Sequence, residues 1–116
     1  MIYGEMLDRV IVDGIAAAVA DYDRADQENQ RDGSVRGFND CRGKTPEELI
    51  VLLGEAESRA TEAHFANRDD YWYWRCRALE VEWVCNVVSA ALRIQLAGHL
   101  PTARGAIKAA EIVGVS

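Results

Sequence analysis

Four consecutive aromatic residues, followed by two arginines around a cysteine, form the densest chemical signal of the chain, the segment YWYWRCR at residues 71–77. Successive side chains on a helix point about 100° apart, so four neighbouring rings cannot all enter one core. Part of this aromatic surface is therefore left for a partner subunit or a ligand. Because guanidinium groups and indole rings both stack on planar molecules, the segment predicts a planar ligand beside Trp72, Arg75 and Arg77. Packing in the core and in a subunit interface is the alternative.

A second chemical group lies between residues 33 and 44, where three glycines alternate with basic side chains. Backbone amides and the forked guanidinium of arginine can together hold a compact anion. We therefore predict an anion site on this segment, at Arg36, Arg42 and Lys44. A solvated loop without a ligand is the alternative.

The sequence offers little for metal or acid–base chemistry. No Glu-x-x-His or His-x-x-x-His pair is present, so the ligand spacing of a helical zinc or di-iron site is missing. Asp21, Asp23 and Asp26 begin like a calcium loop but lack its glycine and a further ligand. We expect no metal and no cofactor. An enzyme that uses Glu82 or His64 as an acid or base is the least favoured functional class.

Charge and cysteine content restrict the partners and the compartment. The 116 residues carry a net charge of -6, which disfavours attraction to duplex nucleic acid or to an anionic membrane. No apolar run approaches the ~18 residues of a membrane span, and residues 1–7 carry an acidic residue, Glu5, where a signal peptide would be basic. We expect a cytoplasmic protein without membrane contact. The three cysteines, at 41, 76 and 85, lack Cys-x-x-Cys spacing and are expected to stay reduced.

Hydrophobic periodicity predicts four helices. The first covers residues 3–24, and the second begins at Thr45 with the capping box that Glu48 completes. The third starts near Asp70 and runs about 28 residues, until glycine interrupts the pattern at Gly98. A short fourth helix starts at Pro101 and ends at Gly114. Residues 26–44 lose the periodicity and are predicted to form a long loop.

These elements predict a single all-α domain over residues 1–116, a bundle of four helices with the third helix at its centre. The third helix carries two apolar stripes on nearly opposite sides, and three short companions cannot cover both. We therefore expect a homo-oligomer whose interface includes part of the stripe Trp74, Val81, Cys85 and Val88. Arg59 falls on the solvent side of the second helix.

The combination favours a non-enzymatic binding protein that sequesters a compact anionic ligand, such as a cyclic nucleotide, on the two segments described above. In size, acidity and helical make-up the chain is similar to small phage-encoded proteins that sequester cyclic-nucleotide immune signals, a similarity of general type without a shared motif. The predicted partners are a second copy of the chain and the small anion. The alternative is a protein-interaction module, an inhibitor or adaptor, whose acidic surface meets a basic partner.

Overall fold

The described residues of the computed structural model, 2–96 and 101–114, form five α-helices and one short 3-10 helix. The all-α prediction is confirmed, but this part of the chain holds one helix more than the four predicted. The elements in chain order are α1 (Tyr3–Asp21), η1 (Ala25–Gln27), α2 (Glu28–Asp40), α3 (Pro46–Phe65), α4 (Tyr71–Leu92) and α5 (Ala103–Val113).

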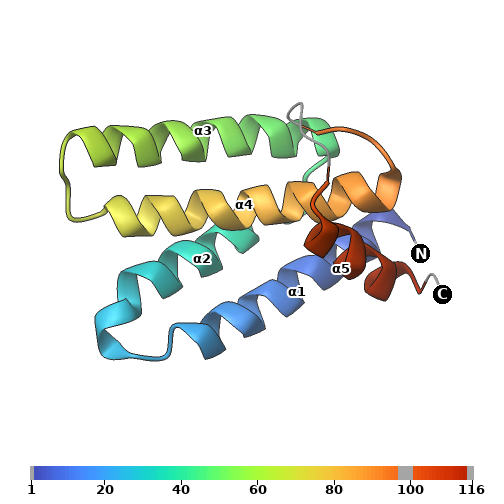
Figure 1. Cartoon of the computed structure of the whole chain (residues 1–116), viewed down its shortest axis with the longest axis horizontal. Helices are drawn as coiled ribbons and strands as arrows, with labels where there is room; N and C mark the ends of the chain where they lie inside the picture. Colours follow the sequence, from blue (N-terminus) through green and yellow to red (C-terminus); the bar gives the residue numbers. More distant parts are fainter. Residues whose placement is uncertain (1, 97–100, 115–116) are drawn as a thin grey trace.

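Helix α4 lies at the centre, as predicted for the third of the expected helices. It packs against α3 on one side and against α2 on another, while α5 and α1 lie against its C-terminal half (Figure 1). It has 22 residues, fewer than predicted, because Arg93 adopts a left-handed backbone with φ of 57° that ends the helix. Gly98, the predicted end, lies outside the described residues.

Residues 26–44 are mainly helical, so the prediction of a long loop there is wrong. Helix α2 has a low hydrophobic content and contains two glycines, and local propensity alone disfavours it. It forms because one of its faces is buried against α1 and α4. That face repeats at helical spacing and consists of Gly33, Ser34, Gly37, Phe38 and the following Cys41.

The two glycines of α2 let its backbone approach that of α4 very closely. A Cβ atom on Gly33 would stand 2.2 Å from the carbonyl oxygen of Tyr73. One on Gly37 would stand 2.5 Å from the carbonyl oxygen of Arg77. Both distances are far below van der Waals contact, so only glycine permits this helix crossing.

Helix starts agree well with the sequence prediction. The Thr45 hydroxyl accepts a hydrogen bond from the Glu48 amide at 3.2 Å, and the Glu48 carboxylate accepts one from the Thr45 amide at 3.0 Å, which completes the predicted capping box. Helix α5 begins two residues after Pro101, with Thr102 as its cap. The Thr102 amide donates to the Asn86 side-chain oxygen at 2.7 Å, which fixes the start of α5 on α4.

Three of the four residues of the apolar stripe assigned to a subunit interface are buried within one chain. Val81 and Val88 are fully buried, and Cys85 is only 4% exposed. Because α2 is a helix, α4 has a partner on two sides, so Val81, Cys85 and Val88 are not available to a subunit interface, whereas Trp74 stays partly exposed. All three cysteines are free, as predicted, and all three are buried.

We expect Gly37→Ala to lower the free energy of unfolding by about 1–3 kcal/mol, because the added methyl group meets backbone that cannot move aside alone. Gly54→Ala is the matched control, since a Cβ there has no atom within 4 Å. Its better helix propensity should raise stability by about 0.5–1 kcal/mol. Urea unfolding of both variants checks this, and similar effects of the two substitutions would contradict the close crossing.

Candidate functional site

Of the three predicted anion-binding residues near the end of α2, Arg36 and Arg42 make local side-chain contacts. Arg36 pairs with Asp40 at 3.0 Å, one helical turn away, and the Arg42 Nε donates to the Asn39 side-chain oxygen at 2.8 Å. The backbone carbonyl of Lys44 accepts a hydrogen bond from the Tyr3 hydroxyl at 2.7 Å. The cradle of loop amides that sequence analysis expected is replaced by helix and turn.

Arg77 is the one predicted residue of α4 that the structure brings close to this group. Its guanidinium binds the Asp40 carboxylate at 2.6 Å, with only 17% of the Arg77 side chain and 12% of the Asp40 side chain exposed. Asp40 therefore joins Arg36 and Arg77, two predicted residues from different helices. Asp40 carries no sequence signal of this role, because a pairing across 37 residues leaves no local pattern.

Trp72 and Arg75 lie elsewhere on α4. Trp72 faces η1 and the start of α2, beside Asp26 and Glu28. Arg75 faces α3, beside Glu57. The six predicted residues thus occupy separate places, and the structure gathers only Arg36 and Arg77 around one carboxylate.

A hollow of about 760 Å³ opens between α3, α4 and the last residue of α2, and Trp74 lies in its wall. The Arg77 guanidinium carbon lies 4.7 Å from the centre of the indole ring, and that of Arg59 lies 5.3 Å from it. Both distances are typical of cation–π contacts. Arg59, predicted to face solvent away from any site, instead lies at this hollow.

The Trp74 ring is held in place by its edge. Its Nε1 donates to the Asp70 carboxylate at 3.0 Å, and Asp70 also accepts a hydrogen bond from the Arg68 Nε at 3.0 Å. The hydrogen bonds and charge of Arg68 keep the pKa of Asp70 below its usual range. The indole is therefore positioned before any ligand arrives.

The charge of the hollow is mixed. Arg77 is neutralised by Asp40, whereas Arg59 makes no ion pair with any residue in the described parts of the chain. Glu55 and Glu62 of α3 also line the hollow. The lining thus holds the guanidinium groups of Arg59 and Arg77 with three carboxylates, and Glu55 and Glu62 lie one helical turn from Arg59 on α3. Exposed Ile50 and Val51 extend its apolar part.

Comparison with protein-family models, with curated proteins and with solved structures finds no match for this chain. Among residues 2–96 and 101–114, no three or more His, Cys, Asp or Glu side chains are grouped to hold a metal ion. Nor is any helix there long and apolar enough to cross a membrane.

Glu80 is the most perturbed carboxyl group of α4. Burial, together with the nearby charge of Asp21, raises its pKa from 4.5 to about 7. No salt bridge compensates it within the part of the chain that is described. The ionised form of Glu80 therefore costs stability in the folded state.

We expect this cost to appear in the pH dependence of unfolding. The stability associated with protonated Glu80 is complete below about pH 4.5 and is lost as the pH rises through 7, because the unfolded chain ionises first. The free energy of unfolding of Glu80→Gln, relative to that of the wild type, should therefore rise by about 1–2 kcal/mol from pH 4.5 to pH 8. This range is smaller than the full pKa shift implies, because the Glu80 side chain is partly exposed to solvent. Urea unfolding at both pH values measures it. Glu82→Gln, at an exposed carboxylate, is the control. If the difference in free energy of unfolding between Glu80→Gln and the wild type is the same at both pH values, the raised pKa of Glu80 is contradicted.

Proposed function

We propose that this protein is a non-catalytic binding protein that takes up a planar ligand with a single negative charge in the hollow over Trp74. The observation that carries the proposal is the placement of two guanidinium groups over one indole ring, at 4.7 and 5.3 Å. Guanidinium planes that lie over an indole ring suit a ligand that combines a flat ring with an anion, because the ring can stack on a guanidinium and the anion can pair with its charge. A hollow of about 760 Å³ is large enough for a ligand of nucleotide size.

The charges around the hollow narrow the ligand class. Arg59 is available to an anion, while Asp40 already compensates Arg77. Glu55 and Glu62 repel further negative charge on the same ligand. A cyclic mononucleotide, with one phosphodiester charge, fits this balance better than a nucleoside di- or triphosphate. Sequestration of such a signal, as small phage-encoded proteins carry out, is the biological role that we propose with it.

We expect calorimetric titration to detect a cyclic mononucleotide and to give at least tenfold weaker binding for the corresponding triphosphate. Arg59→Gln should weaken binding about ten- to a hundredfold, the worth of one charge-assisted contact. Arg104→Gln is the matched control, because Arg104 lies over a different indole, 5.9 Å from the Trp83 ring. It should change the affinity less than twofold.

Two further substitutions locate the site. Arg42→Ala and Arg75→Ala should bind like the parent, because neither side chain lines the hollow. A strong loss in either one, with Arg59→Gln unaffected, would move the ligand to the segments that the sequence favoured. If neither the cyclic mononucleotide nor the corresponding triphosphate binds below millimolar concentration, the ligand proposal fails.

Self-association is a separate part of the proposal. The outer side of α1 carries Val12 and Val19, 54% and 50% exposed, one heptad apart on the helix. An oligomer that buries these side chains removes apolar surface from water. Native mass spectrometry at tens of micromolar should show a dimer or larger species that Val12→Asp with Val19→Asp converts to monomer. A strictly monomeric parent would contradict it.

A further inference from the structure

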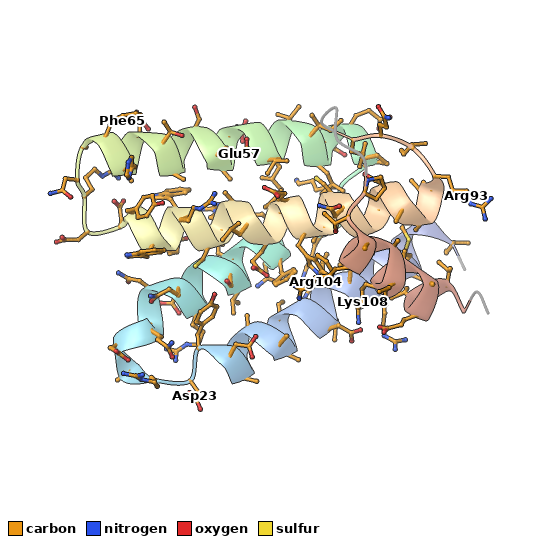
Figure 2. The ribbon with its side chains drawn as sticks, viewed as in Figure 1. Asp23, Glu57, Phe65, Arg93, Arg104 and Lys108 are labelled. Atoms are coloured by element: carbon orange, nitrogen blue, oxygen red, sulfur yellow. The ribbon has the colours of Figure 1, made fainter. Side chains whose placement is uncertain are left out.

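One end of the molecule carries a row of aromatic rings that the proposed ligand site does not use. Ring centres are 5.5 Å apart for Phe65 and His64, 5.3 Å for His64 and Tyr71, and 5.1 Å for Tyr71 and Trp72. Phe65 is 83% exposed and Trp72 56% exposed. We call these four residues the aromatic end, and Figure 2 shows Phe65 at the outer tip of α3. Neighbouring large apolar side chains in water are typical of an interaction surface.

The turn between α3 and α4 holds the aromatic end in one geometry. Asn67 adopts a left-handed backbone with φ of 52°, and the Arg68 amide bonds back to the Ala63 carbonyl at 3.0 Å. Arg68 in turn binds the Asp70 carboxylate. The rings are therefore presented on a short, hydrogen-bonded turn, which lowers the entropy lost when a partner binds.

A second hollow lies directly beside Trp72. It has a volume of about 290 Å³ and is lined by Trp72 together with Asp26, Glu28, Asn29 and Gln30. Glu28 makes no ion pair within the described residues, and Asp26 pairs only with the well-exposed Arg24 at 2.9 Å. An exposed indole face next to carboxylate and amide oxygens is suited to a cation, which the ring quadrupole and the carboxylates attract together.

We infer that the aromatic end is a docking surface for a basic segment of a partner protein. A lysine or arginine side chain of that segment lies on Trp72, between the ring and the carboxylates of Glu28 and Asp26. Apolar side chains of the same segment cover Tyr71 and Phe65. The net charge of -6 favours the approach of such a partner.

The same charges argue against a second copy of this chain on this surface. A symmetric contact centred on this surface would bring two copies of Glu28 and Asp26 into one interface. Like charges at close range disfavour that arrangement. The inference is independent of the ligand proposed for the Trp74 hollow, because the two surfaces share no lining residue.

The probe is a fluorescein-labelled peptide that alternates lysine or arginine with leucine, titrated with the full chain and followed by fluorescence anisotropy. The expected result is saturable binding that weakens when the salt concentration rises, as for exposed charge pairs. A peptide with glutamate at the basic positions should not bind. Absence of binding by the basic peptide up to millimolar protein would overturn the inference.

Variants then locate the contact. We expect Trp72→Ala and Glu28→Gln each to weaken peptide binding about three- to thirtyfold, the range of a cation–π or charge-assisted contact. Phe65→Ala should also weaken it, and its high exposure leaves the fold intact. Glu111→Gln and Ile107→Ala are matched controls, an exposed carboxylate and an exposed aliphatic side chain on α5.

Two outcomes of the variant series contradict the inference. Equal binding by Trp72→Ala, Glu28→Gln and the controls would show that the peptide only follows the net charge. Conversion of an oligomer to monomer by Phe65→Ala, without peptide binding by the parent, would assign the surface to a second copy. Retained nucleotide binding in these variants keeps this test separate from that of the Trp74 hollow.

Discussion

The fold depends on the close crossing of α2 and α4 at Gly33 and Gly37. At both positions a carbonyl oxygen of α4 stands where any other residue would place its Cβ atom. Each glycine in a helix lowers helix stability by about 1 kcal/mol relative to alanine, so the packing at the crossing must offset this loss. Beside it the Phe38 ring lies directly on Gly14 of α1, which closes the contact among three helices. With α2 in place, α4 is covered on two sides within a single chain.

The crossing also decides the electrostatics of the hollow. Because α2 ends against α4, Asp40 reaches Arg77 at 2.6 Å, although 37 residues separate them. That ion pair is largely shielded from water, and removal of Asp40 would leave the Arg77 charge poorly compensated. Arg77, held in this way, lies over the Trp74 ring. The geometry of the proposed ligand site therefore follows from the close backbone contact between α2 and α4 at Gly37 and Arg77.

The segment from Tyr71 to Arg77 is divided among several surroundings, as its helical angle requires. Trp72 faces the carboxylates near η1, Trp74 faces the hollow with Arg59, and Cys76 is buried in the interior. The two exposed surfaces are opposite in character. The hollow over Trp74 contains the guanidinium groups of Arg59 and Arg77, whereas the one beside Trp72 contains the carboxylates of Asp26 and Glu28, and the anionic ligand and the basic partner that we propose rest on this difference.

The sequence by itself determined the helical class, the central place of the helix that starts near Asp70, the cap at Thr45 and the stop at Gly114, because periodicity and capping act within a few residues. It could not determine α2, since glycines in a polar segment favour a loop until a neighbouring helix makes their small size an advantage. Nor could it pair Asp40 with Arg77 or bring Arg59 to Trp74, because such contacts join residues with no local relation. Only the tertiary structure decided which arginines share a site, for the physical reason that packing of helix on helix sets distances between residues remote in the chain.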